Sequence, residues 1–277
     1  MGKVYTTDEL NNAFNKALDL FNDVLDSDIT PENTLLVFFT PETGLTVYEQ
    51  LCRTHFPHML KENYHAPGYF ESFIAQAFVN DDPYGILMRS DLSYESFEIT
   101  EIFLHELSHL FCAKNEIEGG HFFDRYCMGS GEEDGYMNAG YAIWRELVAD
   151  VMADAVMSDM AVVSLTRVKP VIKQLYSQIR MDNPGAKGNM SRLIAQVMIT
   201  REVAGTADWN KACRSIARIL PPDSSIMQMM LMSVHHKLNQ SPFWEITPEF
   251  IMELGQMYCD FMATRITNII RRGKRSQ

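Results

Sequence analysis

The spacing of apolar positions predicts a mixed N-terminal part of the chain. Apolar residues recur at helical spacing over residues 10–25, directly after Thr6–Glu9, which has the form of a capping box, so an amphipathic helix is expected there. Short apolar runs over residues 34–40 and 84–89 are bounded by prolines or turn residues, which favours strands. Residues 100–114 form a longer apolar pattern without Pro or Gly, which predicts a helix.

From residue 138 onward the sequence has a mainly helical pattern. A strong helical pattern covers residues 138–160, and breaks rich in Pro, Gly and Ser separate five further helical segments, at residues 161–180, 191–204, 208–220, 225–239 and 248–271. The Met-rich run of the fourth segment is interpreted as adaptable core; it comprises Met227, Met229, Met230 and Met232. Residues 115–140 hold six of the 15 glycines and are predicted to be a loop.

Residues 105–109 read His-Glu-Leu-Ser-His within the helix predicted over 100–114. Residues four apart lie on one helical face, so His105 and His109 can direct two imidazoles at one point. Glu106 lies one step round the helix, where its carboxylate can reach a water held by a metal. Zinc prefers nitrogen ligands, and catalysis needs a base beside the water, so this spacing favours a zinc hydrolase site.

A second helix supplies candidates for a third ligand. Glu146 and Asp150 are four residues apart on the helix predicted over 138–160 and so share one face. His-Glu-x-x-His on one helix, followed by Glu-x-x-x-Asp on a later one, resembles the gluzincins, the thermolysin-like zinc metallopeptidases. The resemblance covers residues 84–160. It implies that Glu146 is the third ligand of one Zn²⁺ ion and that Asp150 accepts the free ring N–H of His105.

The resemblance also implies a fold and an activity. We expect an α+β, zincin-like chain with a small N-terminal sheet, the active-site helix and a predominantly helical C-terminal half. Residues 1–160 would form the catalytic region and residues 161–277 a helical region, packed together as one compact unit. The activity would be hydrolysis of a peptide or protein substrate with Glu106 as general base.

Further residues of the expected site come from the same resemblance. Gluzincins commonly use a Tyr or His from outside the two motifs to stabilise the oxyanion, and the candidates here are Tyr136, Tyr141, His235 and His236. In zincins the strand before the zinc helix is typically a sheet edge that borders the cleft. That position would let a substrate peptide pair with the backbone of Gly85, Ile86, Leu87 and Met88.

Other assignments of the metal remain open at this stage. His121 competes with Glu146 as third ligand, and the acidic stretch containing Glu116, Glu118, His121 and Asp124 is an alternative place for calcium or a second metal. Two further functional classes are also open. One is a protease-like regulatory or interaction protein with a zincin fold and no general proteolytic activity. The other is a helical interaction protein with a structural metal.

Composition and charge limit the functions and the cellular location that we expect. The net charge of −12 argues against general nucleic-acid binding, which needs a basic surface. The sequence shows neither a secretory signal nor an apolar stretch long enough to span a membrane, and its five cysteines are scattered without a Cys-x-x-Cys pair. We therefore expect a cytoplasmic protein with reduced thiols and no membrane span. The sequence leaves the oligomeric state open.

Overall fold

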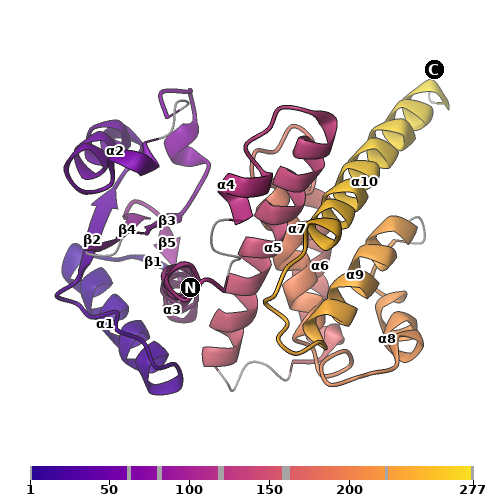
Figure 1. Cartoon of the computed structure of the whole chain (residues 1–277), viewed down its shortest axis with the longest axis horizontal. Coiled ribbons are helices and arrows are strands. Elements are labelled where there is room, and N and C mark those ends of the chain that lie inside the picture. The colour runs from indigo at the N-terminus through magenta and orange to yellow at the C-terminus, as the bar shows by residue number, and fades with distance from the viewer. Residues whose placement is uncertain are drawn as a thin grey trace. The chain divides into compact units, whose positions relative to one another are not determined.

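The chain is mixed α+β, with many helices and a small sheet (Figure 1), as the sequence predicts. The computed structural model describes residues 2–60, 64–79, 83–117, 122–157, 163–221 and 224–275, and side chains of the last helix up to residue 268. Two compact units are distinguished. The first is Met1–Glu116 with Met152–Ser158, and the second is Ile117–Val151 with Asp159–Gln277. This division differs from the predicted boundary at residue 160, because residues 117–151 group with the helical part.

The first unit contains a three-stranded sheet with the order β2-β4-β3. Strands β2 (Thr34–Phe39) and β4 (Tyr84–Arg89) confirm the two predicted strands and pair in parallel. Strand β3 (Ala75–Phe78) pairs with β4 in antiparallel orientation. Two short strands, β1 (Lys3–Val4) and β5 (Ser93–Tyr94), form a separate antiparallel pair.

Strand β4 is the central strand, so the prediction that it forms a sheet edge is wrong. Gly85, Ile86, Leu87 and Met88 each have a partner residue on β2 and another on β3. Every residue of β4 is buried, as expected for a strand covered on both faces. Pairing on both sides leaves these four residues no free edge for a substrate peptide. Among the described strands of this sheet, β3 forms the edge on the antiparallel side.

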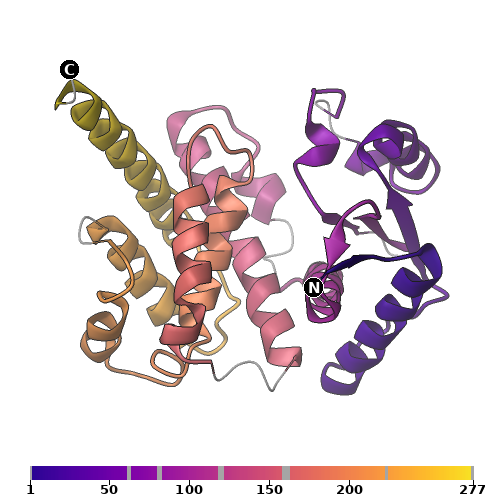
Figure 2. The same cartoon turned by 180° about the vertical axis from the view of Figure 1, so that it is seen from behind.

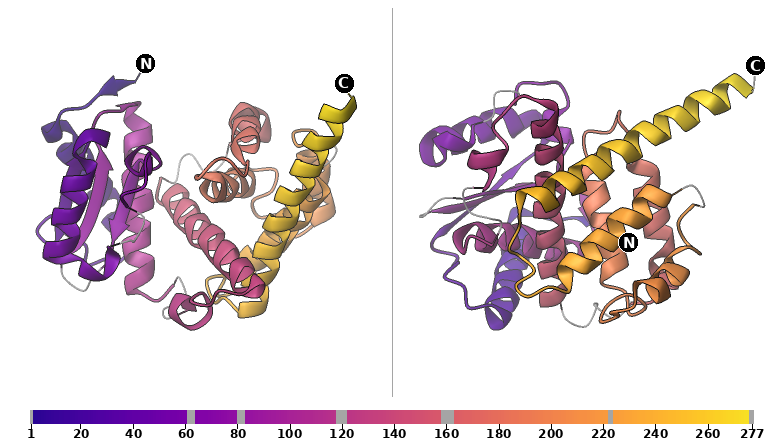
Figure 3. Two further views of the ribbon diagram at one scale, coloured as in Figure 1. Left: turned by 90° about the horizontal axis from the view of Figure 1, so that it is seen from above. Right: turned by 45° about the vertical axis from the view of Figure 1, so that its right-hand side comes forward.

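Helices cover both faces of the sheet (Figures 1 and 3). On one face Ile86 and Met88 contact a core formed by α1 (Thr7–Val24), α3 (Ser96–Lys114) and the last turns of α5 (Glu132–Val156). On the other face Leu87 packs with Tyr48 of α2 (Pro41–His55) and with residues near the short 3₁₀ turns Pro57–Met59 and Tyr69–Glu71. Successive side chains of β4 point to opposite faces of the sheet, so this strand contributes to two separate apolar cores.

Helix α1 begins where the sequence predicts. The Glu9 backbone N–H donates to Thr6 Oγ1 at 3.3 Å, and the Thr6 backbone N–H donates to Glu9 Oε2 at 3.0 Å. This reciprocal pair is the predicted capping box, which satisfies two backbone donors at the start of the helix.

The second unit is helical. It contains α4 (Phe122–Tyr126), most of α5, α6 (Leu165–Gln178), α7 (Ala186–Met198), α8 (Trp209–Ile216), α9 (Ser225–Leu238) and α10 (Pro248–Arg275). Each of the five predicted C-terminal segments overlaps a helix, although α7 begins five residues before the predicted segment and α10 extends beyond it. Helices α6 and α7 lie side by side (Figure 2), and α9 packs against both α8 and α10.

The prediction of a loop over residues 115–140 is wrong in part. Residues 122–126 are helical, and α5 already begins at Glu132. Gly140 lies inside α5, at the point where α10 passes. A Cβ added at Gly140 would lie 1.9 Å from the Ile251 carbonyl oxygen, so this close approach of the two helices requires glycine. Glycine can occur in a loop or at a close contact between two helices, and the glycine content of a segment does not distinguish these two cases.

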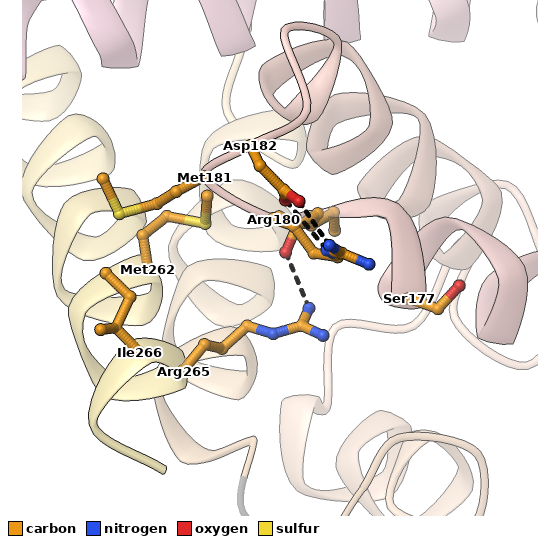
Figure 4. Close-up of a pocket in the computed structure, with 8 residues that line it drawn as sticks. Ser177, Arg180, Met181, Asp182, Met262, Arg265 and Ile266 are labelled. Atoms are coloured by element: carbon orange, nitrogen blue, oxygen red, sulfur yellow. Dashed lines mark hydrogen bonds and ion pairs between the residues drawn. The ribbon is translucent and has the colours of Figure 1, made fainter. Parts of the chain in front are cut away.

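Arg265 of α10 holds the end of α6. Its Nη1 donates to the backbone carbonyls of Tyr176 at 2.6 Å and Ile179 at 2.9 Å, and its guanidinium lies 4.7 Å from the centre of the Tyr176 ring. Figure 4 shows this side chain beside a cavity of about 590 Å³. The last carbonyls of a helix lack partners within it, and Arg265 supplies donors for two carbonyls there.

We expect Arg265→Met to lower the free energy of unfolding by about 1.5–3 kcal/mol, the usual contribution of a hydrogen bond to a charged group. Urea denaturation of the full chain measures this change. Arg180→Ala is the matched control, because Arg180 borders the same cavity but pairs with Asp182 at the exposed surface. Equal denaturation midpoints for the two variants would show that Arg265 does not stabilise this helix end.

Candidate metal centre

Helix α3 carries the two histidines as predicted. It runs without a break from Ser96 to Lys114, after a capping box between Glu95 and Glu98. Apolar residues surround most of its length, which explains why the helix is buried. His109 is 6 % exposed and His105 is half-buried. The strong apolar character of α3 therefore places the His109 imidazole in a largely desolvated position, with His105 one turn away and half-buried.

The two imidazoles are arranged so that one ion can bind both. Their ring centres lie 4.7 Å apart with an interplanar angle of 88°, and the two Nε2 atoms are 3.2 Å apart. Two nitrogen ligands of a tetrahedral zinc, each at its normal bond length, are separated by roughly 3.3 Å. The observed separation of the Nε2 atoms fits that geometry.

Glu146 of α5 belongs, with the two histidines, to a group of three side chains that could hold a metal ion. The ligand atoms of His105, His109 and Glu146 all lie within 4.8 Å of one another. The end of α5 is also packed with α3: Ala153 belongs to the same core as the apolar face of α3, and Met152 Sδ lies 3.2 Å from Cys112 Sγ.

The chemistry of the three ligands favours zinc. Two imidazole nitrogens and one carboxylate oxygen are typical of catalytic zinc sites, in which the fourth position is left for water or substrate. Calcium and magnesium prefer oxygen ligands throughout, so two histidines make either a poor fit. The residues present therefore fit one zinc ion.

Glu106 is positioned next to the first histidine and is 6 % exposed. A carboxylate with so little access to solvent carries a large desolvation cost unless other groups compensate it. The predicted role of Glu106 as a base at the metal site stays a prediction.

Asp150 is buried and has a cationic partner. It lies one turn after Glu146 on α5, is 7 % exposed, and its Oδ1 is 3.5 Å from Nη1 of Arg192 on α7. Asp154, one turn further on, is also buried. The predicted hydrogen bond from His105 to Asp150 stays a prediction. Sequence reasoning missed Asp154, although it repeats the four-residue spacing, and it missed Arg192, for which the sequence offers no signal.

The two tyrosine candidates have partners within the helical unit. The Tyr136 hydroxyl donates to Glu132 Oε1 at 2.7 Å, and this hydrogen bond raises the pKa of Tyr136 to about 12. Tyr141 is nearly buried and stacks on Phe122, with ring centres 5.6 Å apart. The predicted role of either tyrosine as an oxyanion donor stays a prediction.

The two histidine candidates lie on α9. His235 is buried, with its ring 5.3 Å from that of Trp209, and its Nε2 lies 3.4 Å from Nδ2 of Asn239. His236 is exposed and borders a cavity together with His235. Their proposed part in stabilising an oxyanion likewise stays a prediction.

The alternative metal assignments depend on Glu118 and His121, which lie outside the described residues. His121 as third ligand, and a second site with Glu116 and Asp124, therefore stay predictions.

Comparison with protein-family models, with curated proteins and with solved structures found no match. In the part of the chain that the structure describes, no helix is both long enough and apolar enough to span a membrane. The five cysteines are free thiols.

Proposed function

We propose that this chain is a zinc-dependent metallopeptidase with a zincin-like fold. The observation that carries the proposal is the grouping of His105, His109 and Glu146 within 4.8 Å, with the buried carboxylate of Glu106 on the same helix as the two histidines. Two imidazoles, one carboxylate and a separate acid are the minimum that metal-assisted peptide hydrolysis needs from the protein.

Each residue has a defined task in this reaction. His105, His109 and Glu146 would hold the ion, which would supply a water of lowered pKa and polarise the substrate carbonyl. Glu106 accepts a proton from the attacking water and returns it to the leaving amine, which requires a carboxylate that is ionised before the attack. Asp150, held by Arg192, orients the ring of His105 by accepting its free N–H.

The structure offers a different substrate strand from the one predicted. Strand β3 forms a sheet edge among the described strands and packs against α3, which carries Glu106. An extended peptide that pairs with the free side of β3 would have its carbonyl groups aligned along the zinc helix. We therefore assign peptide binding to Ala75–Phe78 in place of the paired strand β4.

Metal analysis tests the proposal directly. We expect one zinc per chain in the purified protein and loss of most of that zinc in His109→Ala and Glu146→Ala, because each variant removes one of three ligands. Glu133→Ala is the matched control, since Glu133 is an exposed acid on the same helix as Glu146. All samples are dialysed against the same zinc buffer before measurement by atomic emission.

Two outcomes would contradict the ligand assignment. Full zinc occupancy in Glu146→Ala would exclude Glu146 and point back to His121 as third ligand. Zinc loss in Glu133→Ala as large as in Glu146→Ala would show that the metal binds acidic side chains without selecting these three.

A further inference from the structure

A second group of potential ligands lies in the helical unit, in a cavity of about 670 Å³ bordered by α8, α9 and α10. The cavity is lined by Trp209 of α8, by Met229, Met232 and His236 of α9, and by Met257 of α10. All of these side chains come from one compact unit. The lining also includes His235, Asn239 and Glu253, so three thioethers, two imidazoles and an indole share this cavity with oxygen-bearing side chains.

The methionines of α9 fall into two classes. Met227 and Met230 are fully buried, in agreement with the prediction that the Met-rich run is core. Met229 and Met232 are 49 % and 47 % exposed, so the core prediction is wrong for these two residues. Their thioethers line the cavity and are accessible to a ligand from solvent.

The exposed pair and His236 share one helical face. Met232 follows Met229 by three residues, and His236 follows Met232 by four, so the three side chains stand in consecutive turns of α9. Neighbouring members of the three have Cβ atoms about 5–6 Å apart, whereas Met229 and His236, two turns apart, are separated by roughly 10 Å along the helix. Long, flexible methionine side chains can close the remaining distance to a common ion without any change in the helix.

The ligand chemistry selects a soft cation. Thioether sulfur binds Cu(I) well and binds hard divalent ions poorly, and imidazole is compatible with copper. The ring of Trp209 lines the same cavity, and the face of an indole attracts a cation. This set differs from that of the histidine pair on α3, where nitrogen and oxygen ligands favour zinc.

We propose that Met229, Met232 and His236 form a site for a monovalent soft metal ion, Cu(I), whose ligands are separate from those proposed for zinc. Ag(I) has the same ligand preference and does not oxidise in air, so it serves as the probe. The site has two thioether ligands and one imidazole, with Trp209 beside them. Because its residues are separate from the zinc ligands, the two proposals can fail independently.

Titration with Ag(I) tests the site on the full chain loaded with zinc. The protein is labelled at the methionine methyl groups, and carbon and proton methyl shifts are followed by NMR. We expect the methyl signals of Met229 and Met232 to shift until one equivalent has been added. Met229→Leu/Met232→Leu should bind Ag(I) at least about 100-fold more weakly, as expected when two of three ligands are lost and packing volume is nearly conserved.

Controls separate this site from the free thiols. The titrated parent protein is Cys213→Ser/Cys259→Ser, because Ag(I) displaces the proton of an accessible thiol and these two thiols are only partly buried, whereas Cys52, Cys112 and Cys127 are buried. Met128→Leu in this parent should leave the two methyl shifts unchanged, because Met128 is 68 % exposed and is absent from the lining of this cavity. His236→Asn should weaken binding without altering the thermal midpoint.

The proposal is overturned if the signals of Met229 and Met232 do not move on addition of Ag(I). It is also overturned if the double leucine variant binds within threefold of the wild type. Should the double variant fail to fold, the methyl shifts of the wild type and the affinity of His236→Asn decide the question.

Discussion

Glu106→Gln is expected to abolish most peptide hydrolysis while leaving one zinc bound per chain. Glutamine has nearly the same shape as glutamate but cannot accept a proton from water, and general acid–base groups contribute roughly 10²–10⁴-fold to rate. The three ligands proposed for the metal are unchanged by this substitution. We would measure kcat/KM on a mixed peptide library and, in the same preparations, zinc content.

Glu133→Gln is the control for that comparison, because it makes the same chemical change at an exposed position of α5. It should retain wild-type activity and metal content. If Glu106→Gln keeps its activity, Glu106 is not the base. A wild-type protein that holds one zinc yet hydrolyses none of the library would favour the regulatory alternative, in which a zincin fold serves binding alone.

The second large effect is expected where α5 and α10 cross. A Cβ added at Gly140 would lie 1.9 Å from the Ile251 carbonyl oxygen, and one added at Gly255 would lie 1.8 Å from the Tyr136 carbonyl oxygen. Both obstacles are backbone atoms, which cannot move without separating the helices. We expect Gly140→Ala to lower the free energy of unfolding by about 1–3 kcal/mol, the usual cost of overpacking.

Gly135 provides the matched control on the same helix. No atom lies within 4 Å of a Cβ added at this position. Gly135→Ala should therefore raise the free energy of unfolding by roughly 1 kcal/mol, the difference in helix propensity between the two residues. Guanidinium denaturation of both variants measures the contrast. A stabilising Gly140→Ala would mean that α5 and α10 do not approach as closely as described.

Local pattern was enough to predict the helices that carry the candidate ligands. The spacing of His105 and His109 needs only a regular helix, and the apolar sequence around them predicts that helix. The capping box at Thr6 and Glu9 is similarly local, since it involves residues three apart. These features follow from contacts within one or two turns of chain.

Features that depend on partners distant in sequence were missed or misplaced. An apolar strand such as β4 fits the centre of a sheet better than its edge, but the pairing of Ile86 with both Leu36 and Ala77 cannot be read from its own residues. The ion pair between Asp150 and Arg192 joins helices that are separate in sequence. In α9, the division of the methionines into buried and exposed pairs depends on where α8 and α10 pack.

The path of α5 has a consequence for how this protein can be divided. Its early turns pack against α10, whereas Ala153 and Val156 fill the core beneath the sheet. A fragment ending at Glu116 would lack those two apolar side chains and would leave part of that core open to water. Gene fusion or domain exchange would therefore have to carry both units together, because a single helix contributes to the interior of each.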